Sequence, residues 1–225
     1  MGMPNSFRKT ELPRSVIVVE DDAFLRSLLA DSLEQVGFEV STAASAADAK
    51  RIIKVINPDA VVLDINLGPG PDGFDIAENL RKSSPDIAIV FLTNLPDPRF
   101  AGRDSKVVSR NTAYLNKHLL SDTNTLVEAL ESVLTERGVA GFRHHELAGR
   151  PLVNLSKTQI QVLQLIAQGK TNQQIADARQ RSLAATESAI TRTFDALGID
   201  AGAEQNVRVK AAVNYVALIK NLPEN

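Results

Sequence analysis

Four acidic residues follow two apolar, strand-like runs in the first third of the chain. Glu20, Asp21 and Asp22 come after SVIVV, and Asp64 comes after VVL, directly before the loop INLGPGPDG. Carboxylates that lie close together repel one another unless a cation holds them, and a set of hard oxygen ligands suits Mg²⁺. Asp64 is therefore a candidate metal ligand or nucleophile, with an ordinary turn residue as the alternative.

A hydroxyl and an ammonium group stand at similar places later in the chain. Thr93 ends the apolar run DIAIVFLT, and Lys117 follows the short run TAYLN. Taken alone, each residue has a structural interpretation: Asp22 as the N-cap of a helix, and Thr93 or Asp64 in a turn. Taken together, they favour a functional site if the strands bring them to one edge of a sheet.

Five strand-like runs alternate with helical patterns over the first 137 residues. Continuous apolar runs such as VVL and IAIVF are typical of parallel strands that are buried on both faces. The alternation predicts an α/β domain with a doubly wound, five-stranded parallel sheet, whose ligands bind at the carboxyl ends of the strands. The expected strands are 15–20, 38–44, 59–65, 86–93 and 112–116, and the expected helices are 22–36, 45–56, 73–83 and 122–137.

The composition is typical of a globular, water-soluble protein with one large domain or two ordinary ones. Of the 225 residues, 44% are hydrophobic, and no apolar run approaches the roughly 20 residues that a membrane span needs. The N-terminus lacks the apolar core of a signal peptide, and the absence of cysteine excludes disulfides and zinc–thiolate sites. A cytoplasmic location is therefore expected.

The net charge of −2 is unevenly distributed along the chain. From Arg150 onward there are nine Lys and Arg residues against six Asp and Glu, whereas the first 149 residues hold 16 against 21. A basic C-terminal part behind an acidic N-terminal part points weakly to nucleic acid as a partner.

The first half of the chain resembles the receiver domain of two-component response regulators over residues 14–137. The resemblance rests on four motifs, VVEDD, VVLDINLGPG, FLTN and YLNK. It implies a flavodoxin-like fold in which Asp64 accepts a phosphoryl group from a sensor histidine kinase. It also implies a phosphoacceptor that is not an enzyme, apart from autocatalytic phosphoryl transfer and auto-dephosphorylation.

The same resemblance implies roles for the residues at the sheet edge. Mg²⁺ would be held by Glu20, Asp21, Asp64 and the backbone carbonyl of Asn66. Thr93 would hydrogen-bond the phosphoryl oxygens, Lys117 would pair with their charge, and Tyr114 would rotate inward as the switch. The chemistry agrees, because a carboxylate that attacks phosphorus needs both negative charges neutralised, which Mg²⁺ and a lysine can do.

An Asp-nucleophile phosphatase would use the same carboxylate edge. Such enzymes usually carry a second, acid–base Asp two residues after the nucleophile, and here that position is Asn66. The sequence therefore disfavours this alternative.

Two helices of the first half carry further expectations. The first is expected to bury one apolar stripe, formed by Phe24, Leu25, Leu28, Leu29, Leu33 and Val36. The helix after Thr93 is expected to start late, because Pro96 and Pro98 cannot lie cheaply inside it. Since that face normally carries the activation signal in the family, the dimer surface is left open.

A linker is expected between the two halves. Residues 138–153 lack sustained periodicity and contain three Gly and a Pro. His144 and His145 within this segment are interpreted as a solvated pair, since no third metal ligand accompanies them.

Residues 154–221 are expected to form a small all-α helix-turn-helix domain. Ser156 with Gln159, and Thr171 with Gln174, have the spacing of capping boxes and predict two helix starts. A third helix begins near residue 183, and a fourth covers about 205–220. The third helix is expected to bury Leu183, Ile190, Phe194 and Leu197.

The helical module resembles the LuxR-type (NarL/FixJ class) DNA-binding domain, through LSKTQIQVLQLIAQGKTNQQIA and its spacing to FDALGI. The resemblance implies that the helix from Ser182 to Leu197 enters the major groove, and that the protein binds DNA as a homodimer formed on phosphorylation. The candidate DNA contacts are Arg179, Arg181, Ser188, Thr191 and Arg192.

Glu187 departs from the family, which usually has a Lys there that touches the DNA backbone. A carboxylate at this position repels phosphate. Two hypotheses therefore stay open: a phosphorylation-controlled DNA-binding transcription regulator, or a receiver protein whose altered helical tail binds protein partners.

Overall fold

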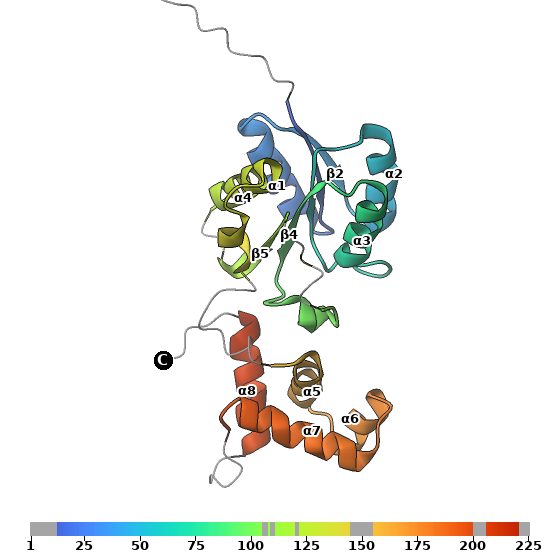
Figure 1. Ribbon diagram of the computed structural model, residues 1–225, viewed down its shortest axis with the longest axis vertical. Helices are drawn as coiled ribbons and strands as arrows, with labels where there is room; N and C mark the ends of the chain where they lie inside the picture. The colour runs from blue at the N-terminus through green and yellow to red at the C-terminus, as the bar shows by residue number, and fades with distance from the viewer. Residues whose placement is uncertain are drawn as a thin grey trace, which may run out of the picture. The chain divides into compact units, whose positions relative to one another are not determined.

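The computed structural model describes residues 13–104, 108, 111–119, 122–144, 155–199 and 206–220 (Figure 1). The chain forms two compact units, residues 1–89 and 90–225. Within the described ranges, every helix is too short or too polar to cross a membrane.

Five strands form a single sheet in the order β2-β1-β3-β4-β5. β1 pairs in parallel with β2 and with β3, so that Val16 lies opposite Val40 on one side and Ala60 on the other. The strands are β1 (Ser15–Val19), β2 (Glu39–Ala43), β3 (Ala60–Leu63), β4 (Ala88–Thr93) and β5 (Thr112–Asn116). All residues of β3, β4 and β5 are buried, because helices cover both faces of the sheet. The predicted five-stranded parallel α/β sheet is confirmed.

Three helices accompany the strands of the first unit: α1 (Ala23–Gln35), α2 (Ala46–Ile56) and α3 (Gly73–Ser83). α2 and α3 lie together on one face of the sheet, and α1 lies on the other (Figure 1). The predicted bounds of α3 agree with those observed. Those of α1 differ by one residue at each end, and those of α2 differ by one residue at the N-terminus.

The apolar stripe predicted for α1 is wrong in half of its members. Leu29 and Leu33 are buried, whereas Phe24 is 80% exposed. Five positions of an α-helix turn through about 140° beyond a full revolution, so Phe24 points away from the face that holds Leu29. Leu28 and Val36 are exposed as well.

The segment between β4 and β5 departs from the expected late α-helix. In its described part, the helical element is the 3₁₀ turn η1 (Pro98–Ala101). The Asp97 carboxylate caps this turn by accepting from the Arg99 N–H at 2.8 Å, and Gly102 ends it with a left-handed φ of 70°. Pro98 fits the first position of the turn because its missing N–H needs no partner there.

The first part of the predicted linker is folded. After α4 (Asn124–Thr135), the chain forms the 3₁₀ turn η4 (Val139–Phe142), and Arg143 then makes a parallel bridge to Tyr114 of β5. His144 is buried, and its Nδ1 accepts a hydrogen bond from the Asn116 N–H at 3.1 Å. The interpretation of His144 as a solvated linker residue was wrong, and His145 lies outside the described residues.

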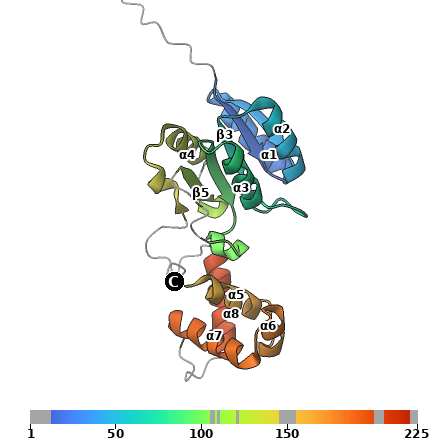
Figure 2. The same ribbon diagram turned by 45° about the vertical axis from the view of Figure 1, so that its right-hand side comes forward.

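Four helices form the C-terminal module: α5 (Lys157–Ala167), α6 (Asn172–Ala178), α7 (Leu183–Ala196) and α8 (Val207–Lys220). α7 packs against both α5 and α6 in this helix-turn-helix arrangement (Figure 1; Figure 2). The capping boxes predicted at Ser156 and Thr171 are both present. The predicted buried stripe of α7 is wrong at Leu183, which is 41% exposed.

Candidate functional site

Three carboxylates meet at the carboxyl ends of β1 and β3. One oxygen from each of Glu20, Asp21 and Asp64 lies within 4.8 Å of the other two. Glu20 and Asp64 are buried, whereas Asp21 is exposed. Their backbones are fixed by the sheet, since the Asp64 N–H donates to the Val19 carbonyl at 2.9 Å and the Glu20 N–H donates to the Ala43 carbonyl at 3.1 Å.

The donor set fits Mg²⁺. Two buried carboxylates and one exposed carboxylate offer hard oxygen ligands, and bringing them together is unfavourable without a cation to offset the repulsion. Asn66 lies next to this group, with its N–H donating to Asp64 Oδ1 at 3.2 Å. Coordination through the Asn66 carbonyl stays a prediction.

Asp22 has a separate, structural task. Its carboxylate accepts a hydrogen bond from the Leu25 N–H at 2.8 Å and caps the N-terminus of α1. The predicted N-cap is therefore confirmed, and Asp22 does not belong to the cluster of Glu20, Asp21 and Asp64.

Asp21→Asn should weaken Mg²⁺ binding about tenfold or more, because it removes one of three negative charges around the ion. Asp22→Asn should leave the affinity within about twofold, because asparagine caps helices nearly as well as aspartate. Titration calorimetry of both variants measures the difference. Equal weakening in the two variants would exclude this division of roles.

Arg26 was overlooked in the sequence. Its Nη1 donates to the carbonyl oxygens of Glu20 and Asp21, at 2.6 and 3.2 Å. One guanidinium thus holds the turn that carries both carboxylates. The signal in the sequence is a basic residue one turn into the helix that follows the acidic run.

The start of α3 fits tightly against the backbone of Asp64. A Cβ atom on Gly73 would lie 2.2 Å from the Asp64 carbonyl oxygen and 2.9 Å from the Ile65 Cα. The Gly73 N–H also donates to the Ile65 carbonyl at 3.0 Å. Glycine at this position therefore lets α3 approach closely enough to fix the loop after Asp64.

Thr93 and Tyr114 are both buried completely, on β4 and β5. The Thr93 hydroxyl accepts from the Leu95 N–H at 3.2 Å, and the Tyr114 hydroxyl donates to the Leu95 carbonyl at 2.9 Å. Tyr114 thus already points inward. Lys117 directly follows β5 and begins the 3₁₀ turn η3 (Lys117–Leu119). Both Thr93 and Lys117 stand at carboxyl ends of strands, and their roles toward a phosphoryl group stay predictions.

The predicted contact residues of α7 lie on its exposed face. Ser188, Thr191 and Arg192 are exposed, while Ile190 and Phe194 are buried on the opposite face. The hydroxyls of Ser188 and Thr191 donate to carbonyls one turn earlier in the same helix, at 3.0 and 3.1 Å. Glu187 is also exposed on this face.

Arg179 ends α6 and is half-buried beside other cations. Burial lowers the pKa of Arg179, and the positive charges of Arg181 and Arg192 lower it further. Its Nε and Nη1 are buried without a hydrogen-bond partner in the described part of the chain. The three arginines therefore share a region of positive potential in which a negatively charged group would be stabilised.

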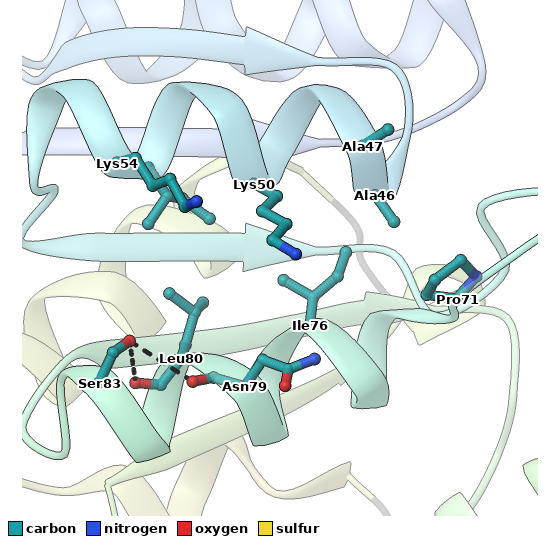
Figure 3. A pocket seen from close by; sticks show the side chains of 10 residues that line it. Ala46, Ala47, Lys50, Lys54, Pro71, Ile76, Asn79, Leu80 and Ser83 are labelled. Carbon is teal, nitrogen blue, oxygen red and sulfur yellow. Dashed lines mark hydrogen bonds between the residues drawn. The ribbon is translucent and has the colours of Figure 1, made fainter.

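A groove of about 460 Å³ lies between α2 and α3 (Figure 3). Ile53, Ile76 and Leu80 line it, and the side chains of Lys50 and Lys54 extend from α2 beside it (Figure 3). The carboxylate cluster contributes nothing to its lining. The groove is therefore separate from the carboxylate cluster.

Comparison with known proteins identifies the family. Residues 16–131, just over half of the chain, match the family model described as the response regulator receiver domain. The chain belongs to the response regulator family. Residues 153–186 of this response regulator also match the model for bacterial regulatory proteins of the luxR family. Both resemblances stated from the sequence are therefore confirmed.

Relatives of this response regulator include transcriptional regulatory proteins. The protein PrrA of Mycobacterium leprae is 30% identical over 174 residues, which cover 69% of this chain and 72% of PrrA. The first curated relatives, ycf27 of Cyanophora paradoxa and AfsQ1 of Streptomyces coelicolor, are 39% and 38% identical, and the response regulator spans about a third of their length (34%).

A solved structure of similar fold covers nearly the whole response regulator. RcsB from Salmonella enterica serovar Typhimurium, described as bound to the promoter P1flhDC, has a TM-score of 0.57 and 19% identity. The match covers 91% of this chain and 98% of RcsB. At this identity, the likeness concerns the fold alone.

Proposed function

We propose that this response regulator is a two-component transcription regulator. Asp64 accepts a phosphoryl group from a sensor histidine kinase, and phosphorylation controls dimerisation and DNA binding. The observation that carries the proposal is the convergence of Glu20, Asp21 and Asp64 within 4.8 Å, in a chain that also holds a helix-turn-helix.

The Asp64 carboxylate acts as the nucleophile. One of its oxygens forms a bond to phosphorus while the bond between phosphorus and the donor breaks, so the chain is a phosphoacceptor. Mg²⁺, when bound by Glu20, Asp21 and Asp64, supplies positive charge that offsets the repulsion between the carboxylate and the phosphoryl oxygens. Lys117 pairs with the transferred charge, and the Thr93 hydroxyl hydrogen-bonds it.

The exposed face of α7 enters the major groove of DNA. Ser188, Thr191 and Arg192 are its candidate contacts with base edges or backbone. The positive charges of Arg179 and Arg181 suit the phosphate oxygens of the DNA backbone. The promoter complex described for RcsB, a protein of similar fold, supports this placement.

α8 offers a surface on which two copies can pair. Val209, Val213 and Val216 are exposed by 58%, 59% and 44%. Their spacing of four and three residues places them on one stripe of the helix. Burial of this stripe against the same stripe of a second copy would stabilise a homodimer. The two α7 helices of such a dimer bind neighbouring half-sites on DNA.

Glu187→Lys tests the DNA face directly. The exchange replaces a repulsive charge by an attractive one beside the DNA backbone. It should tighten binding of the phosphorylated, full-length protein to many sequences by about tenfold at low salt, and steepen the salt slope by roughly one to two units. Fluorescence anisotropy with labelled genomic fragments at several salt concentrations measures both quantities.

Glu34→Lys is the matched control, since it makes the same change of charge on an exposed position of α1. It should alter neither the affinity nor the slope beyond about twofold. If phosphorylated protein binds no genomic fragment at low salt, and Glu187→Lys does not restore binding, the tail binds protein partners instead of DNA.

A further inference from the structure

The groove between α2 and α3 has an apolar floor. Ile53 of α2 lines it together with Ile76 and Leu80 of α3, which are 7% and 4% exposed (Figure 3). Ala46 and Ala47 lie at the N-terminal end of α2, where their short side chains leave the space between the helices open. The volume of about 460 Å³ lies within the range of roughly 300–1,000 Å³ that is typical of small-ligand sites. The two helices therefore leave room for an apolar group of ligand size.

Two lysines accompany this floor on the α2 side. Lys50 and Lys54 are exposed, and their side chains extend from α2 beside the groove (Figure 3). They lie four positions apart on one face of the helix, where like charges repel one another. Within the described residues, neither ammonium group has an ion-pair or hydrogen-bond partner. An anionic group bound between the two lysines would offset their repulsion.

The acidic residues of the two helices are engaged elsewhere. Each of the three has a partner that does not line the groove: Asp48 pairs with Arg51 at 2.8 Å, Glu78 with Lys82 at 3.0 Å, and Asp75 with the Asp72 N–H at 3.0 Å. Among the described residues that line the groove, none is an Asp or a Glu. The positive charge beside the apolar floor is therefore not balanced within α2 and α3, and it favours an anionic ligand.

The polar side chains on the α3 side of the groove bond to their own helix. The Asn79 side-chain amide donates to the Asp75 carbonyl at 2.8 Å. The Ser83 hydroxyl donates to the carbonyls of Asn79 and Leu80, at 3.4 and 3.1 Å (Figure 3). A charged head group therefore binds on the α2 side, where the two lysine ammonium groups are available as donors.

The length of the groove suits a single extended chain. Its α2 side runs from Ala46 to Lys54, which corresponds to about 12 Å along the helix axis. An extended chain advances roughly 1.2 Å per covalent bond, so about ten bonds span this distance. A peptide helix of the same length would have about eight residues, and isolated helices shorter than about 12–15 residues are marginal in water. The groove therefore suits a flexible chain better than a short helix.

We propose that this groove binds a free, single-chain amphipathic anion, of which a medium-chain carboxylate is the simplest example. The carboxylate accepts hydrogen bonds from the ammonium groups of Lys50 and Lys54, one to each oxygen. The chain covers the apolar floor, which removes apolar surface of both partners from water. The site is separate from the cluster that contains Asp64, so it gives the chain a binding function beyond phosphoryl transfer.

Titration of the full-length protein with sodium decanoate, followed by NMR of its isoleucine and leucine methyl groups, tests the site. Decanoate should shift the methyl signals of Ile53, Ile76 and Leu80 saturably, with a Kd on the order of 100 µM, which is reasonable for a ligand of about twelve non-hydrogen atoms. Decyltrimethylammonium has the same chain with a cationic head, and acetate has the anionic head without the chain. Each should bind at least about tenfold more weakly, because each makes only one of the two kinds of contact.

Three variants separate the head group from the chain. Lys50→Gln combined with Lys54→Gln should weaken decanoate binding about tenfold, because both charged donors to the carboxylate are lost. Arg51→Gln removes a charge of the same sign from α2 outside the groove, and it should leave the Kd within about twofold. Ala47→Leu should weaken binding at least about fivefold, because the larger side chain occupies space that the ligand chain needs.

The absence of a saturable shift at about 2 mM decanoate, roughly twenty times the expected Kd, would overturn the proposal. Equal affinity of the double-lysine variant and the Arg51 variant would overturn it as well, and so would equal affinity for decanoate and decyltrimethylammonium. If decanoate does not bind, shifts in the groove caused by an acidic helical peptide or by phosphatidylglycerol vesicles would assign this surface to a protein partner or to a membrane instead.

Discussion

Replacing Asp64 by Asn should abolish phosphorylation of this response regulator. The amide has no negative charge and a delocalised nitrogen lone pair, so it cannot attack phosphorus as the carboxylate does. Incubation with acetyl phosphate and Mg²⁺ should add one phosphoryl group to the wild-type mass. The variant should retain less than about 1% of that modification, because the proposed nucleophile has been removed.

Asp22→Asn is the control for this experiment. It makes the same chemical change next to the cluster. The Asp22 side chain accepts a hydrogen bond from the Leu25 N–H, and an asparagine side chain can accept the same bond. This variant should be phosphorylated like the wild type. Phosphate retained by the Asp64 variant would place the acceptor on another residue, and loss of phosphate in both variants would point to damage of the fold.

Gly73→Ala should damage both the fold and the site. The new Cβ would meet the Asp64 carbonyl oxygen at 2.2 Å and the Ile65 Cα at 2.9 Å. These are backbone atoms of the segment directly after β3, so no side-chain rotation relieves the clash. The free energy of unfolding should fall by about 3 kcal/mol, at the upper end of the cost of overpacking, and phosphorylation of Asp64 should slow.

Gly141→Ala is the matched control for the stability measurement. A Cβ atom there would have no neighbour within 4 Å, and its φ lies outside the left-handed range. Urea unfolding should give a change within about 0.5 kcal/mol for this variant. Similar losses in the two variants would mean that the close approach at Gly73 does not limit stability.

The strands and the helix α3 were predicted best from the sequence. The five residues of β5 and the eleven of α3 were predicted with their observed bounds, and the other strands within two residues at each end. The apolar runs of β3, β4 and β5 have a single stable placement, between the two helical layers. The capping boxes at Ser156 and Thr171 were also predicted correctly, because each depends only on two residues three positions apart.

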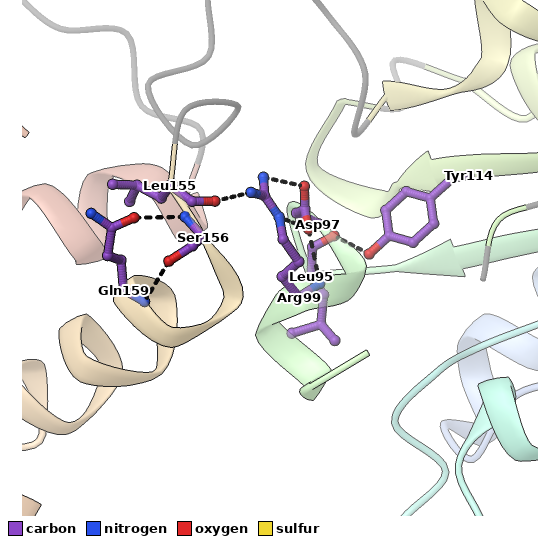
Figure 4. A network of polar contacts seen from close by, with 7 residues as sticks. All are labelled: Leu95, Asp97, Arg99, Tyr114, Leu155, Ser156 and Gln159. Carbon is purple, nitrogen blue, oxygen red and sulfur yellow. Dashed lines mark hydrogen bonds and ion pairs between the residues drawn. The ribbon is translucent and has the colours of Figure 1, made fainter. Parts of the chain in front are cut away.

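The predictions that failed concern segments whose structure depends on contacts between residues that are distant in the sequence. η1 is held by hydrogen bonds to Leu155 (Figure 4) and Gln164, which lie 56 and 64 positions along the chain from their partners. The burial of His144 depends on the backbone of Asn116, 28 positions away. The local periodicity of a sequence does not reveal such distant partners. These segments were therefore predicted to be a late helix and a linker.

The return of the chain to β5 has a consequence for self-association. β5 is the end strand of the sheet, and an apolar end strand with free N–H and C=O groups is a template for strands of other molecules. The Arg143 bridge to Tyr114 and the His144 bond to the Asn116 N–H occupy this edge at two places. Arg143 and His144, in the segment before the helix-turn-helix, therefore also hinder pairing of the β5 edge with strands of other molecules.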